Sequence, residues 1–423
     1  MAAKLNVFYK DQKVGIIQAD SQTQEFAFAY THEWRKNGFE ISPHIPFDTP
    51  ASSSSIKKFL DNLLPEGRAL DIFSLFFQIT KNNTLAITRE IGNETSGALT
   101  FFDDRVESIP TTTRAIKEVE LTQRIQTEDP MRIIIWDGKP RLSVAGVQDK
   151  LPVIYHKGAF SFGEGKLAST HILKFETDRQ HHLIINEYIC MKLAKAVGLS
   201  CAEVKIKHFG DKPALLVTRF DRKRISDDEI ERLHIIDGCQ ALDLPPTHKY
   251  ERNMGTGKRV EDIREGVSFQ KLFNFANQCQ TPIKTKLHIL QWALFNLLIS
   301  NSDAHGKNIS FFADKQGYSL TPFYDMVCIA MYPEFEQQLS MAYGDNFCTD
   351  IQKEDIEAMC QICDINQRLA FKELKNLAKK LQKALHENDF FALAKDEDEK
   401  KFVEEMTTFL TKRAETFLTR IES

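Results

Sequence analysis

The stretch NLLISNSDAHGKNISFF, residues 296–312, decides how the chain is interpreted. The residues from 283 to 300 carry apolar side chains at helical spacing, which predicts a buried helix. Directly behind it stand an aspartate, a histidine, a lysine and an asparagine, at positions 303, 305, 307 and 308. Because a rigid helix fixes the loop that follows it, these four side chains form the first candidate for a functional site.

Composition limits the class of protein. A chain of 423 residues is too long for one ordinary core, and about 150 residues per domain predicts two or three domains. The formal net charge is −4 and the sequence pI is about 6.3. Binding to nucleic acid through phosphate contacts needs a basic face, so this composition argues against a protein that grips nucleic acid by itself.

Cysteine usage and hydropathy predict a cytoplasmic protein. The eight cysteines lie in apolar or helical stretches without the regular spacing of a secreted disulfide framework, which favours a reducing compartment. Cys360 and Cys363 form one Cys-x-x-Cys; without a second pair, a zinc or redox role is less favoured than two helix-face residues. No apolar run reaches the roughly 18 residues of a membrane span, and residues 1–20 lack a signal-peptide core.

Hydrophobic periodicity divides the chain into three parts. Residues 1–110 alternate short strands with a Ser-initiated helical stretch that Pro65 and Gly67 interrupt, which predicts a small α+β unit. Residues 111–224 are rich in strands, and the segments that carry this prediction are 131–136, 151–157, 171–176 and the hairpin 202–220, together with a helix at 181–200. Residues 225–423 are dominated by long helices, with a single clear hairpin that turns at Gly317.

The spacing behind the buried helix indicates phosphoryl transfer. Asp303 and Asn308 are five residues apart, and Asp325 follows the predicted hairpin. In kinase sites an aspartate accepts the hydroxyl proton, an asparagine five residues later holds magnesium, and a second aspartate holds the metals against the phosphates. Carboxylate and amide oxygens are the ligands that magnesium prefers. Asp and Asn are also common in turns, so the hairpin and the β-rich segment upstream carry much of this interpretation.

Lys174 adds a cation to the predicted nucleotide site. It stands between Leu173 and Phe175 in a strand, where its ammonium group needs an anion such as a phosphate or a helix carboxylate. Glu187, in the following helix, is the candidate carboxylate, although an ordinary solvated helix glutamate is nearly as good an interpretation. Residues 141–150 have the small side chains of a phosphate-covering loop, but their single glycine also fits an ordinary hairpin loop.

At these positions the sequence resembles the HipA family of bacterial serine/threonine kinases, the toxin halves of HipA–HipB toxin–antitoxin pairs. The resemblance runs almost end to end. Its landmarks are LLPEG at 63–67, LSVAGVQDKL at 142–151, HILKFE at 171–176, NEYICMKLAKAVGL at 186–199, TRFDR at 218–222, CQALDLPPTHKYE at 239–251, NSDAHGKN at 301–308 and LTPFYD at 320–325. It implies an α+β, protein-kinase-like two-lobed fold, with a β-rich small lobe, a helical large lobe and an extra N-terminal α+β subdomain.

The resemblance also implies a role for each matching residue. Asp303 is then the catalytic base, and Asn308 and Asp325 are the magnesium ligands. The implied ATP-binding residues are Val144, Ala145, Gly146, Val147, Gln148, Asp149, Lys150, Lys174, Thr218, Phe220 and His305. Family members often carry Glu where Thr218 stands, so backbone contacts to adenine are expected there rather than a side-chain contact. Ser143 matches the autophosphorylation position; a doubly charged phosphate beside the loop would oppose ATP binding, although Ser143 could also be an ordinary surface hydroxyl.

Partners follow from the same resemblance. The implied partner is a HipB-like DNA-binding antitoxin, through which this mildly acidic chain reaches DNA indirectly. The implied acceptor is a translation factor, possibly glutamyl-tRNA synthetase, although no residue here identifies it. Two alternatives stay open at this point: a weakly active corepressor that retains the kinase fold, and a kinase for small molecules, because a fold alone does not fix the acceptor.

Overall fold

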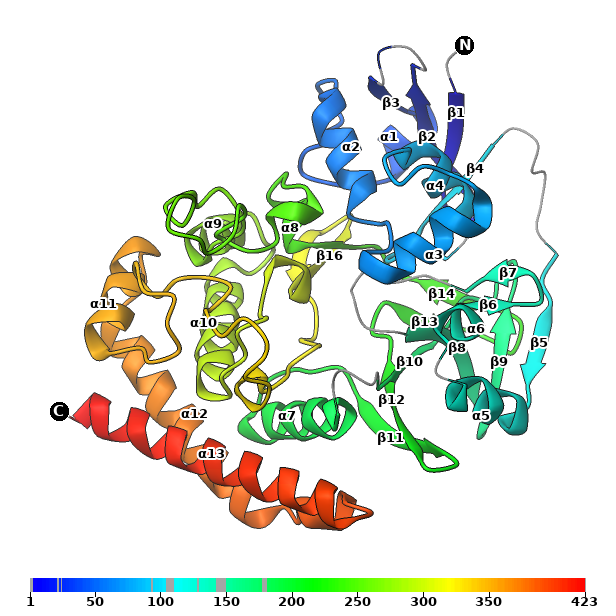
Figure 1. Cartoon of the computed structure of the whole chain (residues 1–423). Helices are drawn as coiled ribbons and strands as arrows, with labels where there is room; N and C mark the ends of the chain where they lie inside the picture. Colours follow the sequence, from blue (N-terminus) through cyan, green and yellow to red (C-terminus); the bar gives the residue numbers. More distant parts are fainter. Residues whose placement is uncertain are drawn as a thin grey trace. The chain divides into compact units, whose positions relative to one another are not determined.

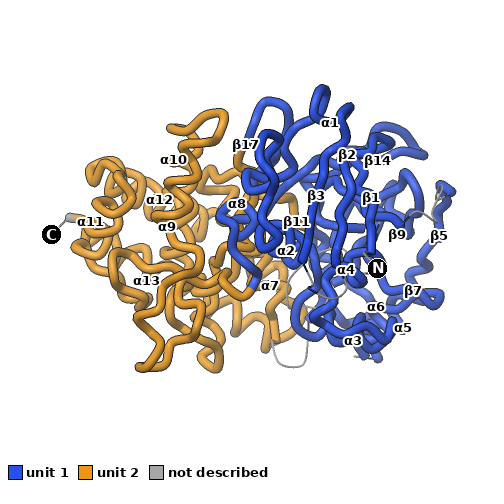
Figure 2. The backbone as a smooth tube through the Cα atoms, turned by 90° about the horizontal axis from the view of Figure 1, so that it is seen from above, with its two compact units in different colours: residues 1–177, 205–246, 311–318 blue, residues 178–204, 247–310, 319–423 orange. Residues whose placement is uncertain are grey.

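The computed structural model describes residues 3–20, 23, 25–92, 94–103, 110–127, 129–141, 150–176 and 181–422. The chain forms two compact units, which Figure 2 colours blue and orange. Unit 1 holds residues 1–177, 205–246 and 311–318, and unit 2 holds residues 178–204, 247–310 and 319–423. Each unit is built from segments that are distant in the sequence. The boundaries predicted at residues 110 and 224 remain a prediction.

Unit 1 begins with a four-stranded antiparallel sheet in the order β3-β2-β1-β4. The predicted hairpin is confirmed as β1 (Ala3–Tyr9) and β2 (Gln12–Ala19), and the strand predicted near residue 100 is β4 (Leu99–Phe102). β3 spans Phe26–Tyr30. The Ser-initiated helical stretch forms α2 (Ser53–Asp61), capped by the Ser52 side chain, and α3 (Gly67–Phe77), so the break at Pro65 and Gly67 lies where the sequence predicted it. The other helices here are α1 (His32–Asn37) and α4 (Thr84–Ile91).

The second sheet of unit 1 has six strands in the order β11-β12-β10-β8-β9-β5. Figure 1 shows these strands beside the short helices α5 and α6. The bounds are β5 Thr113–Ile116, β8 Lys150–His156, β9 Ala159–Gly163, β10 His171–Phe175, β11 Val204–Phe209 and β12 Lys212–Thr218. Leu151, Val153, Leu173 and Phe175 are among the buried residues that form its core. β8 and β10 match the strands predicted at 151–157 and 171–176, and the predicted 202–220 hairpin is β11 and β12, which turns at Gly210 with φ +62°.

One strand prediction was wrong, and some short strands were not predicted. Residues 131–136 form the short helix α6 (Pro130–Ile134) followed by β6 (Ile135–Trp136), which pairs with β7 (Lys139–Pro140). Asp129 caps this helix, with Pro130 in its first turn, and such a start signal outweighs the β propensity of three isoleucines. Beyond residue 225 there are also β14 (Ile230–Arg232), which pairs with β13 (Arg222–Arg224), and β15 (Ile235–Asp237), each too short to leave a periodic signal.

A buried ionic cluster ties β12 and β13 to the residues that precede β4. Asp221 accepts hydrogen bonds from Arg219 Nε at 2.9 Å, from Arg222 Nη1 at 2.7 Å and from the Gly97 backbone N–H at 3.2 Å. Arg222 in turn donates to the carbonyls of Gly97 and Thr95. Burial opposes ionisation of Asp221, but the guanidinium groups of Arg219 and Arg222 outweigh it and hold the pKa of this carboxyl well below its usual range.

Unit 2 is mainly helical, as the sequence predicted. Its longer helices are α7 (Leu183–Val197), α9 (Phe269–Ala276), α10 (Pro282–Leu298), α11 (Lys353–Ile362), α12 (Gln367–Glu387) and α13 (Glu397–Glu422). α7 ends at Gly198 in the left-handed conformation, φ +100°, so the predicted terminator is confirmed. The predicted hairpin near Gly317, which lies mostly in unit 1, is β16 (Ser310–Asp314) and β17 (Gly317–Leu320), and its strands continue the sheet order β15-β16-β17.

Cysteine burial agrees with the absence of a disulfide framework. All eight cysteines are free thiols, and six of them are buried. Cys360 lies in α11 as predicted, whereas Cys363 is the C-cap residue that follows the helix; burial raises the pKa of the Cys360 thiol to about 11. Among the described residues no group of three His, Cys, Asp or Glu side chains is arranged to hold a metal. The part of the chain that the structure describes also contains no helix long and apolar enough to cross a membrane.

Candidate active site

Helix α10 delivers the polar loop of unit 2 as predicted. Its residues from Trp292 to Leu298 are buried, and Asn296 starts a chain of side-chain hydrogen bonds out of the helix. Asn301 Nδ2 donates to Asn296 Oδ1 at 2.8 Å, and the backbone N–H of Asp303 donates to Asn301 Oδ1 at 3.2 Å. The loop therefore leaves the helix on a fixed path, because each buried amide is satisfied by the next residue along it.

The structure brings Asp303 and Asn308 together. Asn308 Nδ2 donates a hydrogen bond to the Asp303 carbonyl at 2.9 Å, across the short 3-10 helix η2 (Gly306–Asn308). Asn308 is buried, whereas the Asp303 side chain is 50% exposed. Because the Asn308 amide nitrogen bonds within the loop, its Oδ1 is available as an oxygen ligand. The Asp303 carboxylate stays accessible to a substrate hydroxyl.

Asp325 is connected to the same loop through its neighbour. Tyr324 Oη donates to the Lys307 carbonyl at 2.8 Å and lies 2.6 Å from Ser310 Oγ, so the segment after β17 is fastened to the segment before β16. Asp325 itself has φ +58°, a left-handed conformation that non-glycine residues rarely adopt and that is enriched at functional sites. The three predicted residues Asp303, Asn308 and Asp325 thus belong to one hydrogen-bonded assembly within unit 2.

His305 lies on the inner side of this loop. It is 7% exposed, and its Nδ1 accepts a hydrogen bond from the Lys307 backbone N–H at 3.2 Å. Accepting that bond requires the neutral tautomer with hydrogen on Nε2, which lies 4.0 Å from Asp303 Oδ1. The imidazole therefore directs an N–H toward the carboxylate side of the loop.

The two predicted phosphate lysines meet in unit 1. Lys150 opens β8 and Lys174 lies in β10, and the antiparallel register pairs them directly. Side chains of such a pair project from the same face with Cβ atoms about 5 Å apart. Lys174 is only 7% exposed. Two lysines that project from the same face repel each other, and a bound anion relieves that repulsion, so this arrangement suits the phosphates of a nucleotide.

The remaining predicted residues of unit 1 stand at the end of β12. Thr218 is the last residue of β12 and pairs with His171, and Phe220 packs edge-on against Phe312 with ring centroids 6.0 Å apart. Arg219 between them donates its backbone N–H to the Thr170 carbonyl. Ser143 and the loop residues Val144, Ala145, Gly146, Val147, Gln148 and Asp149 lie outside the described residues. Glu187 is buried in α7 of unit 2, and its pairing with Lys174 stays a prediction.

Several residues of the site carried no predicted role. Tyr250 was quoted only as part of a motif, yet its hydroxyl donates to Asp303 Oδ1 at 2.5 Å. Tyr324 and Asn301 hold the loop, and neither has a spacing that sequence rules recognise. The one signal available was their proximity to Asp325 and Asp303 along the chain.

Comparison with known proteins extends over nearly the whole chain. The family model described as HipA-like C-terminal domain matches residues 142–388, and the model described as HipA N-terminal domain matches residues 5–102. The serine/threonine-protein kinase toxin HipA of Shewanella oneidensis is 45% identical over 416 residues, which is 98% of this chain and 96% of the relative. The putative kinase Y4mE of Sinorhizobium fredii is 30% identical over 353 residues, 80% of each chain.

A solved structure matches equally broadly. It is the complex of HipA, HipB and operator DNA from Shewanella oneidensis MR-1. One of its chains superposes with a TM-score of 0.91 at 44% identity, covering 99% of this chain and 98% of that one. The fold predicted from the motifs, α+β and kinase-like with an additional N-terminal subdomain, is therefore confirmed.

Proposed function

Since this chain belongs to the HipA family and is a serine/threonine protein kinase, we propose that it transfers the γ-phosphoryl group of ATP with Asp303 as catalytic base. One observation supports this most directly: Asn308 bonds to the backbone of Asp303 within a loop that Tyr324, the neighbour of Asp325, fastens in place. Rate enhancement in phosphoryl transfer comes mainly from positioning and electrostatics, which a rigid loop supplies.

In the proposed transfer, one bond to the γ-phosphorus forms as another breaks. The acceptor hydroxyl oxygen forms a bond to the γ-phosphorus while the bond from that phosphorus to the β,γ-bridging oxygen breaks. The acceptor proton passes to the carboxylate of Asp303, which is half-exposed and so within reach of a protein substrate. ADP leaves with the bridging oxygen. The ammonium groups of Lys150 and Lys174, paired across β8 and β10, face the phosphates in this scheme.

The donor set fits magnesium. Asn308 Oδ1 and the Asp325 carboxylate are hard oxygen ligands, and magnesium sites of this kind use one or two protein ligands together with substrate phosphates and water. When bound, the ion neutralises charge on the phosphates. Asn308 and Asp325 would hold the ion, and Asp303 would stay free of it to act as the base.

We infer that Thr218 and Phe220 contact adenine through backbone groups and that His305 supports the nucleotide side of the loop. Ser143 is the proposed autophosphorylation site, and residues 144–150 are the proposed phosphate-binding loop. Similarity to a HipA seen with HipB and operator DNA supports a HipB-like antitoxin as partner. As the acceptor we propose a translation factor, for which glutamyl-tRNA synthetase is one candidate. Action in the cytoplasm belongs to the same proposal.

Replacement of the base tests the mechanism. Asp303→Asn keeps the size of the side chain but cannot accept the proton, so we expect protein-bound ³²P from [γ-³²P]ATP to form at least a hundredfold more slowly, within the range of general base catalysis. Asp314→Asn, at the end of β16, is the matched control and should keep the parental rate. Transfer by Asp303→Asn at the parental rate would refute the assignment. Phosphoproteomics of cells expressing either form then identifies the acceptor.

A further inference from the structure

Tyr250 contacts the proposed catalytic base directly. Its phenol hydroxyl donates a hydrogen bond to Asp303 Oδ1 at 2.5 Å. The ring meets the His305 imidazole edge-on, at 90° with centroids 5.1 Å apart. Tyr250 belongs to the irregular segment between η1 (Pro246–His248) and α9, and 36% of its surface is exposed. A charged acceptor makes this one of the stronger kinds of hydrogen bond.

The backbone around Tyr250 is fixed to the loop of residues 301–308, which carries Asp303. The Gly306 N–H donates to the Lys249 carbonyl at 2.9 Å, and the Glu251 N–H donates to the Ser340 carbonyl at 2.9 Å. Both neighbours of Tyr250 are therefore anchored. A Cβ on Gly306 would lie 2.4 Å from the Val267 side chain, so only glycine permits this close approach of the loop to Val267.

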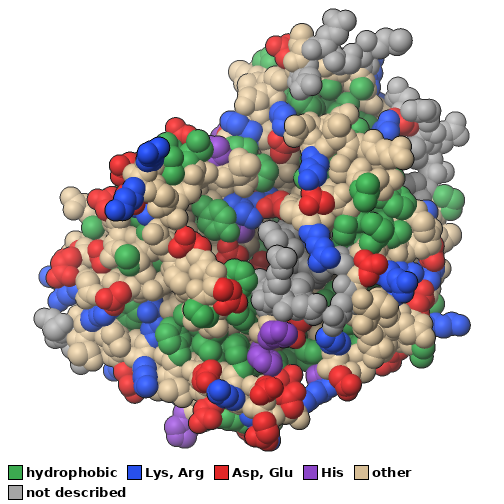
Figure 3. Space-filling model, in the orientation of Figure 1, with side chains coloured by type: hydrophobic (Ala, Val, Ile, Leu, Met, Phe, Trp, Pro, Cys, Tyr) green, Lys and Arg blue, Asp and Glu red, His purple; other side chains and the backbone are tan. Residues whose placement is uncertain are grey.

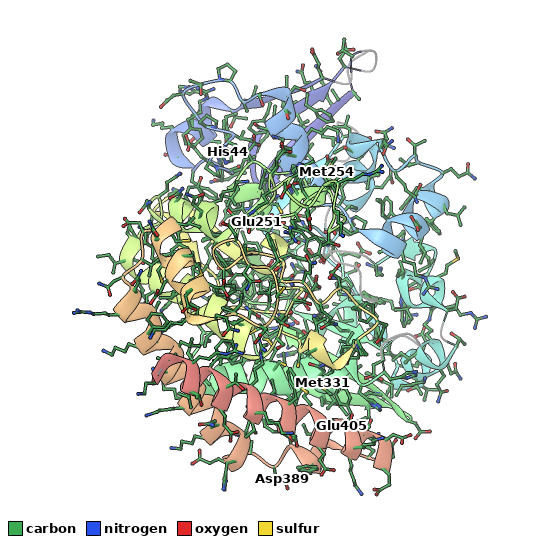
Figure 4. The ribbon with its side chains drawn as sticks, turned by 60° about the vertical axis from the view of Figure 1, so that its left-hand side comes forward. His44, Glu251, Met254, Met331, Asp389 and Glu405 are labelled. Carbon is green, nitrogen blue, oxygen red and sulfur yellow. The ribbon has the colours of Figure 1, made fainter. Side chains whose placement is uncertain are left out.

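Glu251 anchors the segment of residues 249–251. It is 3% exposed, and its carboxylate accepts from Arg264 Nε at 2.7 Å and from the Ala342 backbone N–H at 2.9 Å. Figure 4 labels this residue among the side chains of unit 2. The Gly266 N–H donates to the Glu251 carbonyl at 3.1 Å. A buried charge with satisfied partners resists displacement, so the Tyr250 side chain starts from a rigid base.

The Asp303 carboxylate needs such support. Its backbone is held by Asn301 and Asn308, but its side chain is 50% exposed, and a carboxylate on an exposed side chain rotates about two torsions. Correct orientation of reacting groups is worth several orders of magnitude in rate. The hydroxyl of Tyr250 takes one lone pair of Oδ1 and leaves Oδ2 to receive an acceptor proton.

We propose that Tyr250 is a positioning residue of the kinase: its hydroxyl orients the Asp303 carboxylate toward the acceptor hydroxyl. The inference rests on the proposed role of Asp303 as base. The alternative is that the Tyr250 hydroxyl blocks the place of the acceptor hydroxyl. Blocking predicts faster transfer when the phenol oxygen is removed, whereas positioning predicts slower transfer.

The test is Tyr250→Phe, which keeps the ring against His305 and removes the hydroxyl. We expect kcat for ³²P transfer into protein to fall about tenfold to hundredfold, the size of a lost hydrogen bond to a charged group. KM and Kd for ATP should stay within about twofold, because Tyr250 does not contact the nucleotide in this scheme. Tyr188→Phe, on α7 with Lys192 over its ring, is the matched control and should keep the parental kcat.

A double variant separates positioning from a loss of structure. If Tyr250 acts only through the carboxylate, Tyr250→Phe added to Asp303→Asn slows transfer no further than Asp303→Asn alone. An additional loss in the double variant, or a lower thermal midpoint that accounts for the lost rate, overturns the proposal. Parental or faster transfer by Tyr250→Phe overturns it as well. Failure of the base assignment is seen separately, as parental transfer by Asp303→Asn.

Discussion

At the residue scale, His234 makes the stability of unit 1 depend on pH. Burial lowers its pKa to about 4, and its Nε2 lies 2.8 Å from the Ile41 carbonyl, to which it donates. The unfolded chain binds a proton near pH 6.5, whereas the folded chain does so only near pH 4. The free energy of unfolding therefore falls as pH drops through this window, by up to roughly 3 kcal/mol for this group.

Urea unfolding at pH 7.5 and pH 5.0 measures this effect. The loss of stability between the two pH values should be smaller in His234→Gln, whose amide still donates to Ile41 but does not titrate. His32→Gln, at an exposed position, should show the parental loss. An equal loss in all three proteins would mean that other groups set the acid sensitivity.

The residues that sequence could and could not identify differ in a physical way. Asp303, Asn308 and Asp325 were predicted because their spacing matches the chemistry of metal-assisted transfer. The contact of Tyr250 with Asp303 spans 53 positions and depends on how an irregular segment folds, so no local pattern reports it. Long-range contacts of this kind are fixed by tertiary packing rather than by propensity.

At the element scale, the cluster around Asp221 should be a main source of stability in unit 1. Asp221→Asn leaves the positive charges of Arg219 and Arg222 buried without the negative charge of Asp221 to balance them. Breaking a buried ion pair costs about 3–5 kcal/mol in the free energy of unfolding. Thermal and urea unfolding should both show the loss. Asp227→Asn, whose side chain is 82% exposed near His156, is the control and should change stability by less than about 1 kcal/mol. A loss of similar size in both variants would argue against a special role for burial.

Elements with a strong period were predicted well, and short ones were not. The 17 residues of α10 and the 21 of α12 carry several turns of helical pattern, whereas β13, β14 and β15 have three residues each. Three residues cannot display an alternation. At residues 131–136 the error came from treating branched side chains as strand formers, although Asp129 and Pro130 provide a helix start.

At the scale of the whole molecule, charge predicts how the chain would affect operator binding by the proposed antitoxin. Figure 3 shows basic and acidic side chains interspersed over the visible face, and the net charge is −4. If the antitoxin makes the phosphate contacts, adding this chain should leave the slope of log K against log salt unchanged for operator binding. Each phosphate contact contributed by the chain would steepen that slope by about 0.9. Fluorescence anisotropy between 50 and 300 mM salt, with and without this chain, provides the measurement, and a steeper slope contradicts the prediction.

The pairing of Lys150 with Lys174 also determines where the chain tolerates inserted or deleted residues. Because side chains alternate across a strand, loss or gain of a single codon inside β8 would turn Lys150 away while Lys174 stayed. Changes of length at the exposed turn of Lys157 and Gly158 lie beyond the residues of β8 that pair with β10, so they leave that register in place. Peptide tags and reporter insertions therefore belong at that turn, and the interior of β8 has to keep its length.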